Sequence, residues 1–294
     1  MNFTAKDVQG LRERTGAGMM DCKKALVETN GDVEKAIDFL REKGLAKAAK
    51  KEGRIAAEGL VADYREGNVA ALVEVNCETD FVAKTDRFKD FVKMIAKQVV
   101  EANPADLEAL MASEIDGQTV QALQTAAVAE IGEKITIRRF VRMEGAVDTY
   151  IHLGGSRGVL VQFAEECDRE AMHDVALQIA AASPVCVGRE DLPQEYIDRE
   201  RAVQLATAKE ENANAAKPKP DAIIEKMVDG RMQKYYKEVC LEEQQFVKNP
   251  DVTIKEMLRQ KNASKVLAFV RYEKGEGIEK RKDNFAEEIA NMTK

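Results

Sequence analysis

The chain is poor in the residues that build metal sites and disulfide frameworks. Its 294 residues include no tryptophan, two histidines, six prolines and five cysteines. The cysteines are far apart and never in Cys-x-x-Cys spacing, which is typical of reduced, buried thiols. They are Cys22, Cys77, Cys167, Cys186 and Cys240. We therefore expect neither structural disulfides nor a zinc site.

Long apolar runs and an excess of positive charge are also missing. No window approaches eighteen uninterrupted apolar residues, and the N-terminus has neither a signal-peptide nor a transit-peptide pattern, so we expect a cytoplasmic protein without a membrane span. The net charge of −7 argues against direct binding of nucleic acid. With 45% hydrophobic residues the chain can bury real cores, and its length suits two or three domains.

Motifs for chemistry are missing as well. The sequence has no Gly-x-x-x-x-Gly-Lys-Ser/Thr loop, so we expect no direct nucleotide binding. His152 and His173 have no cysteine or carboxylate cluster at a spacing that would complete a catalytic triad or a metal site. We expect no cofactor, no metal and no covalent chemistry. An enzyme whose site leaves no local motif stays an alternative.

The first fifty residues are typical of a small helical unit. Thr4 can cap a helix to about Arg14, a second helix fits residues 20–29, and Asp32 can cap a third. Residues 41–54 are basic and rich in alanine, helical at least in part. They suit a solvated linker, which we favour, or a contact with an acidic partner or RNA.

From Glu58 the pattern changes to that of strands and then repeats. Strands at 60–64 and 69–75 flank the four-residue turn 65–68, and a helix carrying Phe88, Phe91, Val92, Ile95 and Val99 follows. Strands at 149–152 and 158–163 with a helix ending before Pro184 repeat this plan. The segment Leu72–Val75 with Asp80 lies 88 positions before Leu160–Phe163 with Asp168. This favours two related ββα halves.

The second half carries an insertion. A helix from Pro193 to about Asn214 and a returning helix after residues 215–220 predict a protruding antiparallel coiled-coil hairpin. The expected contact stripes are Tyr196, Val203, Ala206 and Ala213, then Ile224, Val228 and Tyr235. Further expected elements are helices at 107–113, 119–129 and 253–259, strands at 135–143 and 266–272, and a terminal helix from about Asn284.

The predicted fold class is α+β. We expect an N-terminal three-helix domain with its basic connector (1–54) and two related ββα subdomains (55–143 and 144–273). The coiled-coil insertion falls at about 191–238, and a C-terminal helical module at 274–294 completes the chain.

Two short segments place apolar side chains where a core does not require them. Phe81 lies between Asp80 and Lys84 at an element boundary, and its spacing alone favours the first core residue of the next helix over a presented wedge. Met19 and Met20 follow a glycine-rich turn, which suits a docking surface or helix packing.

Two long motifs carry a resemblance to a known family. They are LRERTGAGMMDCKKAL at 11–26 and EVNCETDFVAK at 74–84, supported by residues 131–135, 157–161 and 275–280. On these residues the chain resembles the elongation factor Ts family over essentially its full length. The resemblance implies a guanine-nucleotide exchange factor that binds elongation factor Tu and promotes GDP release during translation elongation.

The resemblance also implies an architecture and a binding site. It implies a ubiquitin-associated-like N-terminal domain, two core subdomains, a coiled coil and a C-terminal module. The Asp80–Phe81 pair, within the motif that includes Thr79 and Val82, would insert near the partner's magnesium site. Further implied contacts are Arg12, Met19, Met20, Ile131, Gly132 and His152, although residues 153–157 depart from the family's form.

Other classes of function fit part of the pattern. A scaffold or chaperone built on a helical adaptor and a coiled coil would present the same surfaces without exchange. An RNA-binding module could use the basic connector at 41–54, against the overall acidity.

Overall fold

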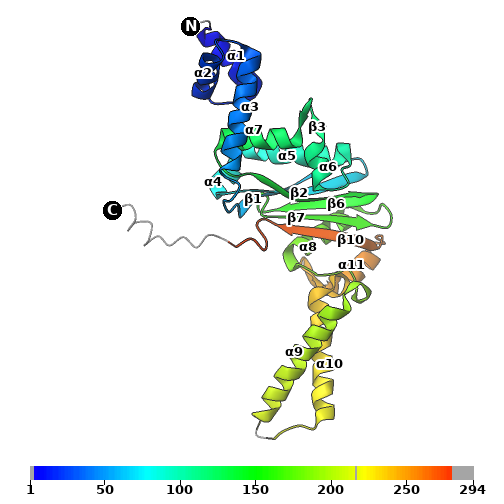
Figure 1. Cartoon of the computed structure of the whole chain (residues 1–294). Helices are drawn as coiled ribbons and strands as arrows, with labels where there is room; N and C mark the ends of the chain where they lie inside the picture. The colour runs from blue at the N-terminus through cyan, green and yellow to red at the C-terminus, as the bar shows by residue number, and fades with distance from the viewer. Residues whose placement is uncertain (1–2, 216, 280–294) are drawn as a thin grey trace.

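The computed structural model describes residues 3–215 and 217–279, which fold as a mixture of helices and sheets. Figure 1 shows the N-terminal helices above two central sheets, with a helical hairpin extending below. The helix predicted from about Asn284, and with it most of the predicted module at 274–294, lies outside the described residues.

Three helices form the N-terminal unit: α1 (Ala5–Thr15), α2 (Met19–Glu28) and α3 (Val33–Ala49). The predicted caps are present, because the Thr4 side chain accepts a hydrogen bond from the Asp7 amide and Asp32 accepts one from the Lys35 amide. Their buried side chains form one small core, consisting of Val8, Leu11, Cys22, Ala25, Leu26 and Ala36.

Helix α3 continues through most of the basic connector. It runs to Ala49 and packs on α7 (Val120–Ile131), where Gly44 lets the two backbones approach with Ala129 in contact. Beyond its end, the Lys51 ammonium donates to the carbonyl of Gly132. Residues 41–54 are thus helical in part, as expected, and most of them are exposed as in a solvated linker, although one face of the helix packs on the core. Alanine, leucine and lysine favour helix, and the helix gains a packed face on the core.

The first half contains β1 (Glu58–Glu66), β2 (Val69–Cys77) and β5 (Thr136–Glu144) in the antiparallel order β1-β2-β5. Glu66 pairs with Val69, so the hairpin turn is the two residues Gly67-Asn68 rather than the four expected. Helix α5 (Asp86–Ala102) covers the outer face with the predicted stripe of Phe88, Phe91, Val92, Ile95 and Val99.

The second half has the same connectivity. Strands β6 (Ala146–His152), β7 (Arg157–Phe163) and β10 (Val266–Glu273) form the order β10-β7-β6, with helix α8 (Arg169–Ala182) on the outer face. In each half the late strand pairs with the second hairpin strand. Leu72 and Leu160, aligned in the sequence repeat, both lie between the sheets.

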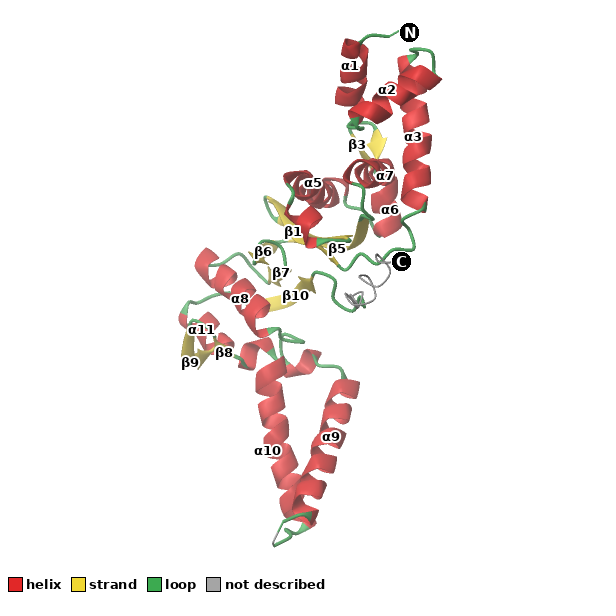
Figure 2. Cartoon of the chain, turned by 90° about the vertical axis from the view of Figure 1, so that its left-hand side faces the viewer, coloured by secondary structure: helices red, strands yellow, loops and turns green. Residues whose placement is uncertain are grey.

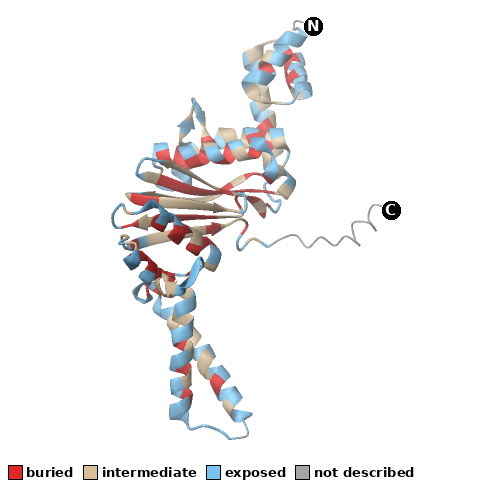
Figure 3. Ribbon diagram, turned by 180° about the vertical axis from the view of Figure 1, so that it is seen from behind, coloured by how far each residue is buried: buried red, intermediate tan, exposed pale blue. Residues whose placement is uncertain are grey.

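The two sheets pack face to face. Their shared core comprises Val61, Ala70, Leu72, Val147, Leu160 and Tyr272. Figure 3 shows buried residues concentrated on these sheets and on the helices that cover them, whereas the hairpin below is largely exposed. The centre of the molecule is therefore a four-layer stack of helix, sheet, sheet and helix.

Short elements complete the described residues. The helices are α4 (Asp80–Lys84), α6 (Leu107–Ala112) and α11 (Ile254–Gln260), with 3₁₀ turns at Arg189–Asp191 and Leu241–Glu243. Two small hairpins, which the sequence pattern did not predict, consist of β3 (Glu114–Ile115) with β4 (Gln118–Thr119) and β8 (Gln245–Phe246) with β9 (Asn249–Thr253).

The long hairpin consists of α9 (Gln194–Ala213) and α10 (Asp221–Val239), which project from the core (Figure 2). Its contact cluster is Ala208, Ile224, Val228 and Met232, flanked by Ile197, Leu205, Tyr235 and Tyr236. The α10 stripe was predicted correctly. The α9 stripe was wrong, because Tyr196, Val203, Ala206 and Ala213 are all exposed. Ile197, Leu205 and Ala208 instead follow the helical period toward α10.

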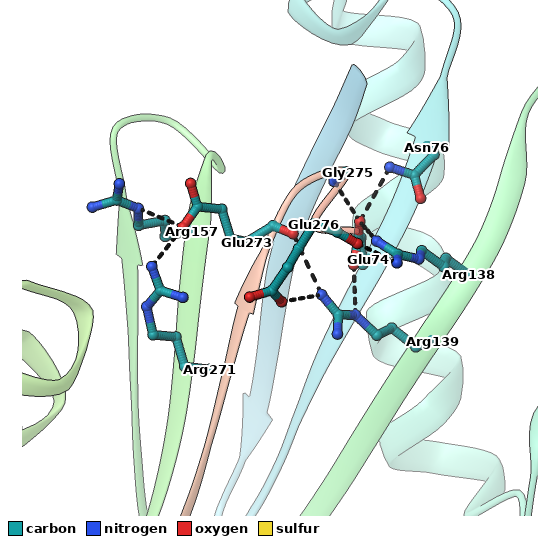
Figure 4. Close-up of polar contacts among 9 residues, drawn as sticks. All are labelled: Glu74, Asn76, Arg138, Arg139, Arg157, Arg271, Glu273, Gly275 and Glu276. Carbon is teal, nitrogen blue, oxygen red and sulfur yellow. Dashed lines mark hydrogen bonds and ion pairs between the residues drawn. The ribbon is translucent and has the colours of Figure 1, made fainter. Parts of the chain in front are cut away.

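A buried carboxylate joins the end of β10 to the first sheet (Figure 4). Glu74, whose side chain is 0% exposed, accepts hydrogen bonds from Arg138 Nη1 (2.9 Å), Arg139 Nε (2.6 Å), the Asn76 amide (3.1 Å) and the Gly275 backbone N–H (2.7 Å). Arg138 Nη2 also donates to the carbonyl of Glu276. Since Glu74 comes from β2 and Gly275 follows β10, this carboxylate ties the two halves together.

Across residues 3–215 and 217–279, no helix is both long and apolar enough to cross a membrane. The five cysteines are free thiols; four are buried and Cys167 is half-buried.

Candidate protein-binding surface

Phe81 lies on the short helix α4, which directly follows β2. Thr79 caps this helix by accepting a hydrogen bond from the Val82 amide, and Thr85 ends it and caps α5. Val82 and Ala83 face the first core, whereas the Phe81 side chain points away and is 78% exposed. The spacing alone favoured a core position for Phe81, and the structure contradicts this. Because α4 ends at Thr85 and α5 begins there in a new direction, Phe81 does not continue the apolar stripe of α5.

Glu133 fixes the segment that precedes Phe81. Its carboxylate accepts hydrogen bonds from the backbone N–H groups of Glu78 and Thr79, each at 3.0 Å, and from the Thr79 hydroxyl at 2.6 Å. In return, the Glu78 carboxylate accepts from the Lys134 amide at 2.6 Å. Glu133 was not among the predicted contact residues, although it falls in a matching stretch. Its role follows from contacts across 54 positions, which no local pattern reveals.

Asp80 is held as a surface ion pair. Its carboxylate lies 2.5 Å from Lys84 Nζ, one turn further along α4. The hydrogen bond from Lys84 lowers the pKa of Asp80 below its usual 3.8. Lys84 Nζ also lies 5.9 Å from the centroid of the Phe81 ring. The tip of α4 thus presents an aromatic ring beside an ion pair formed by an ionised carboxylate and an ammonium group.

The predicted N-terminal residues gather beside a groove between the three-helix unit and the core. Met20 is 74% exposed and Met19 43% exposed at the start of α2. Arg12 and Met19 line the groove, opposite Arg87 of α5 and Glu130 of α7, which form a 2.6 Å ion pair. The groove is therefore framed by α1, α2, α5 and α7.

Ile131 and Gly132 end helix α7 next to this groove. Ile131 is half-buried against the first core. Gly132 is exposed in the left-handed region at φ +87°, and its amide donates to the Val128 carbonyl. The turn leads directly into Glu133, so this loop supports α4 as well as offering its own surface.

His152 ends strand β6 in the second sheet. It is half-buried, and its Nδ1 lies 3.1 Å from the Tyr150 hydroxyl. The next residue, Leu153, was not predicted as a contact. Leu153 is 77% exposed with φ +45°, a conformation that a bulky side chain rarely adopts. Its only sequence signal is the departure of residues 153–157 from the family's form.

The β6–β7 turn is firmly attached to the first sheet. The Gly155 carbonyl accepts a hydrogen bond from the Val61 amide at 2.8 Å, and a Cβ on Gly155 would lie 2.8 Å from Leu60 Cδ2. Leu60 pairs with Val75 near the end of β2, shortly before α4. Figure 1 shows α4 at this same end of the first sheet. The structure thus brings α4 and the turn carrying Leu153 to one end of the stacked sheets.

These features define a class of site. Large apolar side chains are exposed to solvent, and the backbone that carries them is held by helix caps, by the Glu133 carboxylate and by sheet hydrogen bonds. This combination is typical of a protein-binding surface. Among the described residues, no group of three or more His, Cys, Asp and Glu side chains could hold a metal ion.

A sequence model of one family, described as Elongation factor TS, matches residues 78–276, which is more than half of the chain. The chain therefore belongs to the elongation factor Ts family, and the resemblance drawn from its motifs is confirmed. Members of this family are nucleotide exchange factors for elongation factor Tu in protein biosynthesis and catalyse no covalent chemistry. They act with a GTPase partner.

Proposed function

We propose that this chain promotes GDP release from elongation factor Tu by inserting Phe81 and Asp80 near the partner's magnesium and phosphate site. The observation that carries the proposal is the 78% exposure of Phe81 on a helix whose preceding segment is held by three hydrogen bonds to Glu133. An exposed aromatic ring on a fixed support pays little ordering entropy when it enters a pocket.

Exchange follows from coupled binding. A factor that weakens nucleotide binding to the GTPase is itself bound more weakly when the nucleotide is present. Accelerating release about 10⁴-fold requires lowering the barrier by roughly 5.5 kcal/mol. Burying one Phe ring contributes about 1.5–3 kcal/mol. Phe81 is therefore the centre of a wider contact, and other residues supply the remainder.

Asp80 can change partners at low cost. Its ion pair with Lys84 is solvent-exposed, and exposed pairs of this kind are screened by water and contribute little to stability. The ionised carboxylate is thus available to compete with phosphate oxygens for the partner's magnesium environment. Lys84, once released, is free to face an acidic group on the partner.

The rest of the contact uses the other predicted positions together with Leu153, and these are exposed or, at Ile131 and His152, half-buried. We assign Arg12, Met19, Met20, Ile131 and Gly132 to the same GTPase domain as Phe81. His152 and Leu153, on the second sheet, would reach another domain of the partner. In this arrangement, residues 1–54 and 55–143 contact one domain of the partner. Residues 144–273, which include the hairpin at 191–238, contact the other.

Replacing Phe81 by Ala tests the proposal. We expect GDP release from elongation factor Tu to slow several-fold to a hundredfold, because the wedge is lost. The melting temperature should hardly change, since exposed substitutions stay within about 0.5 kcal/mol. The measurement is release of fluorescent GDP at substoichiometric amounts of this chain, together with a thermal melt.

Phe88→Ala is the matched control, because Phe88 lies on the next helix and is fully buried. It should lower the free energy of unfolding by about 3–5 kcal/mol. Normal GDP release by a folded Phe81→Ala variant would remove Phe81 from the mechanism. A wild-type chain that binds the GTPase without accelerating release would instead favour the scaffold alternative.

A further inference from the structure

Two cysteines that are distant in the sequence meet at the base of the long hairpin. Cys186 follows α8 and Cys240 caps the C-terminus of α10, 54 positions later. Their backbones lie side by side as an isolated parallel bridge. The Val185 amide donates to the Val239 carbonyl at 2.8 Å, and the Leu241 amide donates to the Cys186 carbonyl at 2.9 Å. The two Sγ atoms are 3.6 Å apart.

We propose that Cys186 and Cys240 are an oxidisable pair that forms a disulfide across the base of the α9–α10 hairpin. A disulfide needs the sulfurs at about 2.05 Å, so they must approach by about 1.5 Å. Rotation of the side chains can supply this movement, because the backbone bonds on both sides already hold the two residues in register.

The surroundings of the pair are fixed. Leu192 completes a small apolar cluster with the two cysteines, and Tyr235 and Tyr236 pack against it. The Arg189 guanidinium lies 4.3 Å from the centroid of the Tyr236 ring and pairs with Glu243. Within the described residues the other thiols have no thiol partner. Cys22 lies in the N-terminal core, Cys77 in the core of the first half, and Cys167 against the core of the second half.

Burial makes the pair slow to react. Cys240 is 0% exposed and Cys186 is 6% exposed, so an oxidant reaches Cys186 first. Desolvation raises the pKa of Cys186. Desolvation, followed by the hydrogen bond from Cys186, raises the pKa of Cys240 to about 12. Little thiolate forms at neutral pH, so the pair reacts slowly. Brief contact with an oxidant leaves it reduced, and prolonged contact oxidises it.

The chemistry balances with hydrogen peroxide as the oxidant. The Cys186 sulfur attacks one peroxide oxygen, so an S–O bond forms and the O–O bond breaks; the departing hydroxide takes the thiol proton and leaves as the first water. The Cys240 sulfur then attacks the sulfenic sulfur, so the S–S bond forms and the S–O bond breaks. The departing hydroxide takes the Cys240 proton and leaves as the second water. The two thiols lose two electrons to the peroxide, and their protons end in the two waters.

The test is a thiol map of the full-length wild-type chain. After peroxide treatment the protein is unfolded, the remaining thiols are alkylated and the peptides are separated without reduction. We expect a cross-linked peptide containing Cys186 and Cys240, three alkylated cysteines instead of five, and recovery of all five after dithiothreitol. The cross-linked chain should also melt at a higher temperature, because its unfolded state has a closed loop.

Cys240→Ser should abolish both the cross-link and the rise in melting temperature, whereas the matched Cys167→Ser variant should keep both. The proposal is overturned if Cys186 and Cys240 stay alkylatable while Cys167 oxidises. It is equally overturned if Cys186 proceeds to sulfinic acid in the wild type without a cross-link. The thiol map of the wild-type chain tests the proposal by itself, even if the Cys240→Ser variant fails to fold. Because no GTPase is used, the result is independent of the proposed exchange function.

Discussion

Leu153 combines exposure with an unfavourable backbone conformation. For a side chain with a Cβ, the left-handed region costs roughly 1–2 kcal/mol. The turn nevertheless holds Leu153 there, because Gly155 is fixed to Val61 on the neighbouring sheet. A glycine at this position would be easier to accommodate, so the leucine is better explained by what its side chain contacts on a partner than by the fold.

Leu153→Gly is expected to separate binding from folding. The variant relieves the strain of φ +45° and adds chain entropy to the unfolded state, and these effects, each about 0.4–2 kcal/mol, offset one another. The melting temperature should therefore stay nearly constant. Exchange on elongation factor Tu should slow several-fold, measured as GDP release against the concentration of this chain.

Leu153→Met is the control, since methionine retains an apolar side chain and should retain exchange. If Leu153→Gly and the wild type release GDP equally fast, Leu153 is not part of the contact.

Glu133 provides a test of how Phe81 is positioned. Glu133→Gln replaces charge-assisted hydrogen bonds to Glu78 and Thr79 by weaker neutral ones, so we expect α4 to lose its fixed orientation. GDP release should slow several-fold while the ring is still present. In the double variant with Phe81→Ala, Glu133→Gln should add little further loss, because it acts through Phe81. Fully additive losses would assign Glu133 a role of its own.

At this scale the motifs singled out Phe81, which the structure shows to be exposed, but not the Glu133 carboxylate that holds the segment before it. Local spacing favoured burial for Phe81, because the cap at Thr85 that redirects α4 is a single residue within an otherwise helical pattern. Glu133 and Leu153 depend on contacts between segments far apart in the chain. A period or a motif carries no information about such contacts.

At the scale of elements, an acid-sensitive bond joins α2 to α3. The Asp21 carboxylate accepts hydrogen bonds from Lys43 Nζ at 2.6 Å and from Lys47 Nζ at 3.0 Å. The bond from Lys43, followed by that from Lys47, lowers the pKa of Asp21 below 3.8. Because the folded value is below the unfolded one, this stabilisation is present above pH 3.8 and is lost as the pH falls through the folded pKa.

We expect Asp21→Asn to destabilise the N-terminal helices slightly near neutral pH, since solvent screens a partly exposed pair. The difference from the wild type should vanish at a pH below the folded pKa of Asp21. Hydrogen exchange of the α2 amides at both pH values measures it. Asp38→Asn, at an exposed position of α3, is the control. A difference that persists in acid would mean that the charge of Asp21 is not its source.

Helices were the most predictable elements, since caps such as Thr4 and Asp32 and the stripe of α5 are local. The partner face of α9 was not predictable in the same way. Alanine is tolerated on both the buried and the exposed face of a helix. The residues of α9 that become the contact stripe therefore depend on where α10 packs. The short hairpins at 114–119 and 245–253 bury too few residues to leave an alternating pattern.

At the scale of the whole molecule, Glu74 is the buried polar link between the two halves, in addition to the Arg65–Asp148 and Lys274–Glu58 ion pairs. Glu74→Ala leaves Arg138 and Arg139 without their central acceptor, and breaking a buried ion pair costs about 3–5 kcal/mol. We expect a corresponding fall in the free energy of unfolding, measured by urea denaturation. Glu144→Ala, which removes an exposed partner of Arg142, should cost less than about 1 kcal/mol. Similar losses for both variants would contradict a joining role for Glu74.

Helix α3 connects the N-terminal unit to the core as one continuous helix. Its 17 residues span about 25 Å at about 1.5 Å per residue. One end is embedded in the N-terminal core and the other is clamped along α7, whose last turn leads into the carboxylate that steadies α4. Under the proposed function, Met20 and Phe81 both contact the partner, and α3 and α7 then set the distance between these two contacts. The fit of a partner would depend on that distance.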